Sequence, residues 1–221
     1  RTLAGGVRRL NAAPKPNKPS VWQSFSQPAA GTMFFFGFSS GLPFLLVAGT
    51  LAFWLKDNPI VLKEITLIAS AGMLYAFKFV WAPLLDHWRL PLFARRGRRR
   101  GWLLMAQLGV IASLLAMAAI TPTQLGPFIA ATLGVAFFGA TQDIAVDAYR
   151  LEIADDSHQA ALAASYMAGY RVAALLATAG ALYFADWFGN SDLGYQHGAW
   201  ASTYMLFAVL MLPGLITTLW M

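Results

Sequence analysis

Four charged residues lie inside stretches that are otherwise apolar, and a fifth lies at the end of one: Lys78, Asp143, Asp147 and Arg171, with Arg150 at the end. Asp143, Asp147 and Arg150 are spaced i, i+4 and i+7, so a helix would carry them on one face. A charge at the centre of a membrane-spanning helix costs about 2.5–3.5 kcal/mol, and such residues usually pair or line a hydrated cavity. The pattern predicts a hydrated pathway with protonatable carboxylates at Asp143 and Asp147, and with Lys78 and Arg171 as their cationic partners. The alternative is a set of buried ion pairs that only orient the helices.

The residues that must position these charges are strongly apolar. Of the 221 residues, 58% are hydrophobic, 12% are charged and none is cysteine. A globular domain is about 45–50% apolar and about 25% charged. The composition therefore excludes a soluble enzyme domain, a disordered chain and a disulfide-stapled module. His87, His158 and His197 are scattered without metal-ligand spacing, so neither a metal site nor a cofactor is expected.

Six stretches are long enough to span a membrane, which takes about 20 mainly apolar residues per helix. They are too long and too little alternating to be strands of a barrel. We therefore predict an all-α membrane protein with a bundle of six transmembrane helices. The stretches cover about residues 34–54, 65–85, 102–120, 127–149, 161–185 and 200–221. Residues 1–30, which are basic and rich in proline, are predicted to form an N-terminal tail.

Lys and Arg residues concentrate at one end of these stretches. They lie in the tail, in the loop between the second and third stretches, and at Arg150, whereas Lys56 and Lys63 lie at the other end. Positively charged loops remain in the cytoplasm, so both ends of the chain are predicted to be cytoplasmic. The net charge of +6 then indicates contact with anionic membrane lipid, and no nucleic-acid partner is expected.

The first stretch contains a glycine- and proline-rich segment with Gly37, Ser40, Gly41 and Pro43. Proline removes a backbone donor and clashes with an earlier carbonyl, so we expect the helix to kink or open there. Such breaks are tolerated in membranes where protein or a water-filled cavity satisfies the freed groups. The segment is therefore predicted to gate or line a substrate path. The alternative is close helix packing through the glycines.

The loop after the second stretch combines one carboxylate with a run of arginines. Asp86 ends the stretch, and the cations that follow are Arg95, Arg96, Arg98, Arg99 and Arg100. We predict that Asp86 accepts hydrogen bonds from the start of a neighbouring helix and that these contacts, together with Arg150, hold one conformation of a moving protein. The alternative role of the arginines is to set topology and contact anionic lipid.

The fifth stretch has small residues at intervals of four: Ala161, Ser165, Gly169 and Ala173. A ridge of this kind favours tight packing between membrane helices. Tyr170, beside Arg171, remains a candidate to face a ligand.

Several blocks together resemble AmpG-type muropeptide permeases of the major facilitator superfamily. The blocks are GFSSGLP at 37–43, KFVWAPLLD at 78–86, GRRRGWLL at 97–104, TQDIAVDAY at 141–149 and GYR at 169–171. Asp86 with the basic run resembles the loop between the second and third helices of that superfamily. The acetyl-coenzyme A transporter branch shares part of the pattern.

The resemblance implies a twelve-helix transporter of the bacterial inner membrane, of which this chain would be the N-terminal six-helix half. It implies proton-driven import of N-acetylglucosaminyl-anhydro-N-acetylmuramyl peptides for cell-wall recycling, and a link to β-lactamase induction. The expected partners are the muropeptide, protons, membrane lipid and the C-terminal half. Helices one and four would line a central cavity.

In such a symporter, Lys78 and Arg171 would attract the carboxylates of the muropeptide. Gln142 and Tyr149 would donate or accept hydrogen bonds with its sugar or peptide groups, and Tyr170 would face the ligand. These five residues are the predicted substrate site.

Asp143 or Asp147 would take up the proton. Burial generally raises the pKa of a carboxyl group and a nearby cation lowers it. Substrate that competes for Lys78 or Arg171 would thereby couple protonation to transport.

Three other functions remain open at this stage. The first is a major facilitator transporter of another substrate, such as acetyl-coenzyme A. The second is a polytopic membrane enzyme, although short loops and scattered histidines argue against one. The third is a non-transporting half that binds or regulates a partner.

Overall fold

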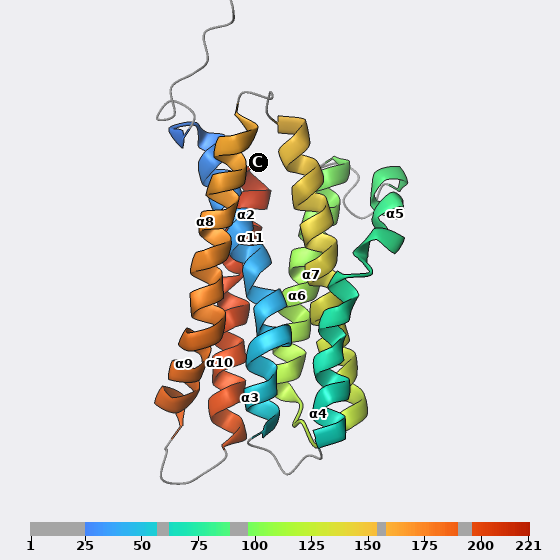
Figure 1. The fold of residues 1–221 in the computed structure, drawn as a ribbon, viewed down its shortest axis with the longest axis vertical. Helices are drawn as coiled ribbons and strands as arrows, with labels where there is room; N and C mark the ends of the chain where they lie inside the picture. The colour runs from blue at the N-terminus through green and yellow to red at the C-terminus, as the bar shows by residue number, and fades with distance from the viewer. Residues whose placement is uncertain (1–24, 57–61, 89–96, 154–157, 190–195) are drawn as a thin grey trace, which may run out of the picture.

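The chain folds into a bundle of long helices that run along a common axis (Figure 1). The computed structural model describes residues 25–56, 62–88, 97–153, 158–189 and 196–221. Within these ranges the regular structure is helical and contains no strand. The all-α prediction is confirmed. Most of the predicted N-terminal tail lies outside the described residues.

Several helices follow one another within a single span, joined by short π-helical or 3₁₀ segments. The α-helices are α2 (Pro28–Leu45), α3 (Leu51–Lys56), α4 (Leu62–Ala69), α5 (Ala82–His87), α6 (Arg98–Ala119), α7 (Leu125–Ile153), α8 (Gln159–Leu175), α9 (Ala181–Phe188), α10 (His197–Leu210) and α11 (Leu212–Trp220). The joining segments are η1 (Leu46–Thr50), η2 (Ser70–Tyr75), η3 (Lys78–Val80) and η5 (Leu176–Gly180).

Five continuous stretches are long and apolar enough to cross a membrane. They are Pro28–Lys56, Arg99–Ala119, Leu125–Ile153, Gln159–Phe188 and His197–Trp220. All five begin a few residues before the predicted starts, because hydropathy marks the apolar segment whereas the helix continues into its polar flank. With the bent pair described next, the described residues supply up to six spans of a multi-pass membrane protein.

The second span is not the straight helix predicted for residues 65–85. It consists of Ile65–Tyr75 and Lys78–His87, which are bent by 45° at the break between them. Around the break, backbone bonds run from residue i to i−3, as from Ala76 N–H to the Met73 carbonyl at 2.9 Å. These are 3₁₀ bonds, which wind the chain more tightly than α-helical ones and place residues i and i+3 on the same side. The bend therefore brings Tyr75 and Lys78 to one face.

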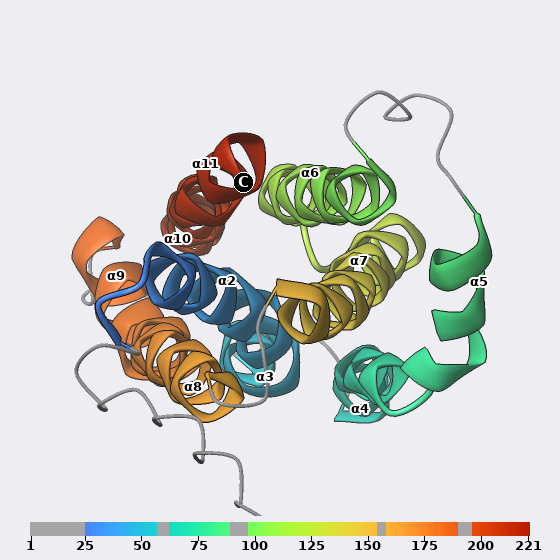
Figure 2. The ribbon, with the colours of Figure 1, turned by 90° about the horizontal axis from the view of Figure 1, so that it is seen from above.

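Helix α2 lies in the middle of the bundle (Figure 2). Helices α6, α10 and α11 lie on one side of α2 and α7, and α8 and α4 lie on the other. The most extensive helix contacts join α2 with α8 and α6 with α7. This arrangement puts spans one and four at the centre of the molecule.

Glycines let α2 and α8 touch backbone to backbone. A Cβ on Gly37 would lie 1.9 Å from the Tyr166 carbonyl oxygen, and a Cβ on Gly169 would lie 2.0 Å from the Phe34 carbonyl oxygen. A Cβ on Gly41 would lie 2.9 Å from the Tyr170 carbonyl oxygen. The predicted small-residue ridge of the fifth span therefore packs on the glycine segment of the first.

The first span opens one turn beyond Pro43 and not at it. Helix α2 continues through Pro43 to Leu45, and η1 follows as a π-helical turn in which the Leu51 N–H bonds to the Leu46 carbonyl. A second π-helical turn, η5, interrupts the fifth span, and the Thr50 hydroxyl donates to the Ala177 carbonyl within it. The Thr50 side chain thus links the two irregular turns and supplies a hydrogen-bond donor to a carbonyl group of η5.

Two apolar clusters fill the interior of the bundle. One lies toward the end that carries the Arg-rich start of α6 and includes Phe36, Leu103 and Val146. The larger one includes Leu42 and Val110. Between them, α2, α6 and α7 carry buried polar side chains, so a polar layer separates the two clusters.

Candidate transport site

Lys78 and Asp143 form an ion pair between the second and fourth spans. The Nζ of Lys78 lies 3.8 Å from Oδ2 of Asp143. The Asp143 side chain is 14% exposed and that of Lys78 is 36% exposed. A mostly buried carboxylate therefore faces a cation that solvent or substrate can still reach. The sequence offered Lys78 and Arg171 as partners for the two aspartates without assigning the pairs, and the structure places Lys78 with Asp143.

Tyr75 completes one side of this pair. Its hydroxyl is buried and has no hydrogen-bond partner, and the same holds for Oδ1 of Asp143. The ring contacts Phe44 edge to face at 4.8 Å between centroids. Gly139, one turn before Asp143, makes room for the hydroxyl, because a Cβ there would lie 2.0 Å from it. Two unpaired polar groups, a donor and an acceptor, are thus held beside Lys78.

Gln142 anchors α7 to the serine pair of α2. Its Nε2 donates to Ser39 Oγ at 2.9 Å and to Ser40 Oγ at 3.1 Å. The Ser40 hydroxyl also lies beside the Asp143 carboxylate and the Tyr166 hydroxyl. Gln142 is fully buried, so it positions the helix that carries Asp143 and does not present its amide to a ligand in this conformation.

The other charges of the fourth and fifth spans are arranged differently from the prediction. Asp147 pairs with Arg150 on its own helix at 3.7 Å. Arg171 is exposed, and within the described ranges no carboxylate forms an ion pair with it. The expected partnership of Arg171 with an aspartate is therefore wrong in this conformation. The reason is that Arg171 lies on the face of α8 turned away from α2.

The two remaining aromatic candidates lie at different levels. Tyr170 lies near Asp143 and contacts Tyr166, with 6.3 Å between ring centroids. Tyr149 packs edge to face on Phe36, at 5.7 Å, in the cluster toward the basic end. The structure thus places Tyr170 beside the Lys78–Asp143 pair and Tyr149 two helical turns away along α7.

At the basic end, Arg99 bridges two helices. Its Nη1 donates to Asp86 Oδ1 at 2.7 Å, and its Nε donates to Glu152 Oε1 at 2.9 Å. The Arg99 side chain is 16% exposed, whereas the side chains of Asp86 and Glu152 are about half exposed. The bridge joins α5, α6 and α7, and Arg99 itself lies in the first turn of α6.

The other residues of the predicted gate fall into two groups. Gly37 and Gly41 make the close contact between α2 and α8, which supports the packing alternative for them. Arg95 and Arg96 lie outside the described residues, and Arg98 and Arg100 belong to the first turn of α6.

Four residues of the site were not among the predicted site residues: Ser39, Tyr75, Glu152 and Tyr166. Tyr75 precedes Lys78 by three positions, which is a neighbouring position on a helix and was an available signal. Glu152 lies beyond the predicted end of the fourth span at residue 149. Ser39 and Tyr166 carry no signal until α2 is docked against α7 and α8.

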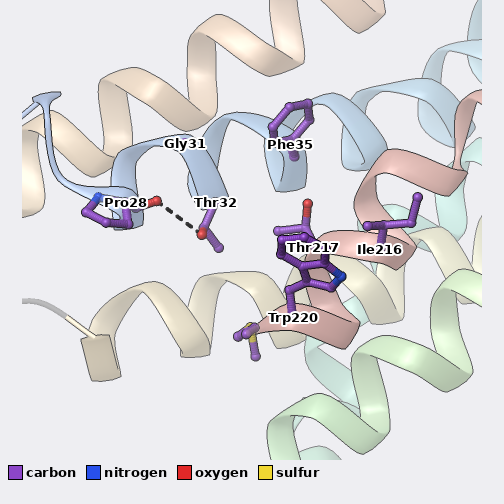
Figure 3. Close-up of a pocket in the computed structure, with 8 residues that line it drawn as sticks. Pro28, Gly31, Thr32, Phe35, Ile216, Thr217 and Trp220 are labelled. Carbon is purple, nitrogen blue, oxygen red and sulfur yellow. Dashed lines mark hydrogen bonds between the residues drawn. The ribbon is translucent and has the colours of Figure 1, made fainter.

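A pocket of about 400 Å³ lies apart from these groups, between the start of α2 and the end of α11 (Figure 3). It is mostly apolar, and its two hydroxyl groups, on Thr32 and Thr217, donate to carbonyls of their own helices. Its lining is Pro28, Gly31, Thr32, Phe35, Ile216, Thr217, Trp220 and Met221. No predicted site residue lines it.

Comparisons with known proteins agree with the resemblance. A family model described as acetyl-coenzyme A transporter 1 matches residues 33–134. The anhydromuropeptide permease of Escherichia coli K12 is 38% identical over 197 residues, which is 88% of this chain and 38% of that protein. The putative transporter AmpG 4 of Rickettsia felis is 34% identical over 179 residues, 80% of this chain and 41% of its own length.

The chain spans about two fifths of the length of the curated relatives it matches. These relatives are named permeases and transporters and not enzymes, so the prediction of a non-enzyme is confirmed. By sequence and by its bundle of membrane spans, the chain belongs to the AmpG-type permeases of the major facilitator superfamily.

Proposed function

We propose that this chain contributes six spans to a proton-coupled importer of anhydromuropeptides in the bacterial inner membrane, with its N-terminus in the cytoplasm. The observation that carries the proposal is the Lys78–Asp143 pair beside unpaired polar groups, in a chain related to an anhydromuropeptide permease. Import would supply cell-wall recycling and the signal for β-lactamase induction. A C-terminal bundle would complete the central cavity.

The pair provides a way to couple substrate and proton. A carboxylate of the muropeptide that binds Lys78 competes with Asp143 for the same cation. Once its partner is withdrawn, Asp143 is a buried carboxylate, and burial favours the neutral, protonated form. Substrate and proton are therefore taken up together, and the pair re-forms once both have been released.

The Arg99 bridge controls the alternation between a cavity that is closed to the cytoplasm and one that is open to it. While Arg99 holds Asp86 and Glu152, helices α5, α6 and α7 are joined at the basic end and the cavity is closed to that side. Breaking the bridge lets the cavity open to the cytoplasm. Two conformations of comparable energy are what a transporter of this kind requires.

The test is uptake of labelled anhydromuropeptide by cells that lack their own permease and express the full reading frame. We expect uptake that collapses when a protonophore dissipates the proton gradient. Uptake that persists in the protonophore would refute proton coupling and leave the substrate in place. Loss of β-lactamase induction on deletion of the gene would support the regulatory link.

Acetyl-coenzyme A is the second candidate substrate, because the matched family model bears its name. The same cells distinguish the two. Uptake of labelled acetyl-coenzyme A without uptake of muropeptide, with membrane insertion confirmed, would transfer the assignment.

A further inference from the structure

The polar layer between the two apolar clusters consists of Ser39, Ser40, Gln107, Gln142 and Thr218. All five side chains are fully buried. They come from four helices, α2, α6, α7 and α11. A buried polar layer is costly unless its groups are paired, so its hydrogen bonds need to be accounted for one by one.

Two amides of the polar layer are only half satisfied. Thr218 donates to Gln107 Oε1 at 2.9 Å, and Gln142 donates to both serines. Gln107 Nε2 and Gln142 Oε1 have no hydrogen-bond partner. One is a donor and the other an acceptor, and leaving such buried groups unpaired is strongly unfavourable.

Gly214 of α11 brings these amides to the same serine. A Cβ on Gly214 would lie 2.5 Å from Ser39 Oγ and 3.4 Å from Gln107 Nε2. Ser39 Oγ is also the group to which Gln142 is bonded. Both amides therefore lie near Ser39 Oγ, which donates its own proton to the Phe36 carbonyl at 3.2 Å and can only accept from a further partner. A donor on Gln107, an acceptor on Gln142 and this hydroxyl oxygen supply the two to four polar partners that a buried water requires.

We propose that Gln107, Ser39 and Gln142 bind an ordered internal water, and that through it Gln107 is a positioning residue for Asp143. The water accepts from Gln107 Nε2 and donates to Gln142 Oε1. Gln142 precedes Asp143 directly, and the bonded Ser40 lies beside the Asp143 carboxylate. Helices α6 and α11, which carry no residue of the ion pair, thereby belong to the site. The positioning role of Gln107 rests on the proposed function.

Direct observation tests the water. The full-length transporter is placed in lipid nanodiscs and its structure determined at a resolution that shows ordered water. We expect density within hydrogen-bonding distance of Gln107 Nε2 and Gln142 Oε1, and its loss in Gln107→Leu. Amides that bond directly to each other, with no density between them, would overturn the proposal. This result does not depend on what the protein transports.

The pH dependence of uptake tests the positioning role. The ionisable groups that face Asp143 are Tyr75 and Lys78 from the second span, Asp147 from α7, and Tyr166 and Tyr170 from α8. Gln107→Leu changes none of them. We expect a shifted midpoint of the pH profile with an unchanged KM, because Gln107 is fully buried and is not among the residues proposed to bind substrate.

Two further variants keep this test decisive. Thr218→Val removes the hydroxyl that holds the Gln107 amide, and we expect a smaller shift in the same direction. Ser113→Ala, on the same helix but outside the polar layer, should leave the profile unchanged. Wild-type profiles for both Gln107→Leu and Thr218→Val would refute the positioning role. Absence of any uptake by the wild type would instead refute the proposed function.

Discussion

Asp143 combines burial of its carboxylate with a cationic partner that is more exposed. The carboxylate is mostly withdrawn from solvent, yet it lies 3.8 Å from the more exposed cation of Lys78. The exposed fraction of Lys78, 36%, leaves the pair accessible enough for substrate to compete with it. The neighbouring Asp147 is half exposed and paired within its own helix, so only Asp143 combines burial with an interhelical partner.

We predict that Asp143→Asn abolishes proton-coupled uptake, whereas Asp147→Asn reduces it only slightly. Coupling between two bound ligands is typically worth about 5–150-fold, so the Asp143 variant should lose at least about tenfold in gradient-driven accumulation. Accumulation of labelled substrate at several external pH values measures the effect. Full accumulation by Asp143→Asn would show that another group carries the proton.

A separate prediction concerns Lys78. Lys78→Gln removes the cation that substrate and Asp143 share, so we expect KM to rise about tenfold, equivalent to about 1.4 kcal/mol. Lys56→Gln, at the exposed end of α3, is the matched control and should retain the wild-type KM. An unchanged KM in Lys78→Gln would place substrate recognition elsewhere, with Arg171 as the next cation to replace.

At the scale of elements, the contact between α2 and α8 determines the geometry of the site. Close approach through Gly37 and Gly169 brings Tyr166 and Tyr170 to the serine pair of α2. The π-helical turns η1 and η5 lie further along the same two spans and are joined by Thr50. Spans one and five therefore form one packed unit, against which α7 and the bent second span can be placed.

Gly37→Ala and Gly169→Ala should destabilise this unit, because each added methyl meets backbone at about 2 Å. Overpacking of this kind costs about 1–3 kcal/mol. Thermal unfolding of the purified protein in detergent should show a clearly lowered Tm. Gly31→Ala, on the same helix with open space around it, is the control. Equal Tm values for all three variants would contradict the close contact.

For the whole molecule, we propose that the Arg99 bridge sets the balance between conformations. It joins three helices at one end, whereas the other end is held by apolar contacts and by the aromatic cluster around Trp54 and Tyr204. The two ends thus differ in what holds them closed: charges that can separate at the basic end and packed rings at the other.

We predict that Arg99→Gln shifts the transporter toward the form open to the cytoplasm. Exposed ion pairs contribute about 0.2–1 kcal/mol each, so losing two should change the ratio of conformations by up to about thirtyfold. The described chain has no cysteine, so a single cysteine introduced beside Asp143 can be labelled selectively. Arg99→Gln should increase its labelling from the cytoplasmic side. Glu152→Gln should give a smaller increase in labelling from the cytoplasmic side.

Asp186→Asn, on α9 outside the bridge, is the matched charge removal and should not alter labelling. Reduced labelling of the Arg99 variant would mean that the bridge stabilises the cytoplasm-open form and would reverse its assigned role.

The sequence by itself determined the helical class, the approximate spans, the family and the presence of opposite charges within the spans. These follow from hydropathy, helical spacing and the high cost of an unpaired charge in a membrane. Each of these properties can be read from a single segment of the chain. The tertiary structure decided the bend of the second span, the bridge from Arg99 to Glu152, the exposure of Arg171 and the polar layer with Gln107 and Thr218. These depend on which helix faces which, and on glycines that allow backbones to touch, and no spacing along a single helix contains that information.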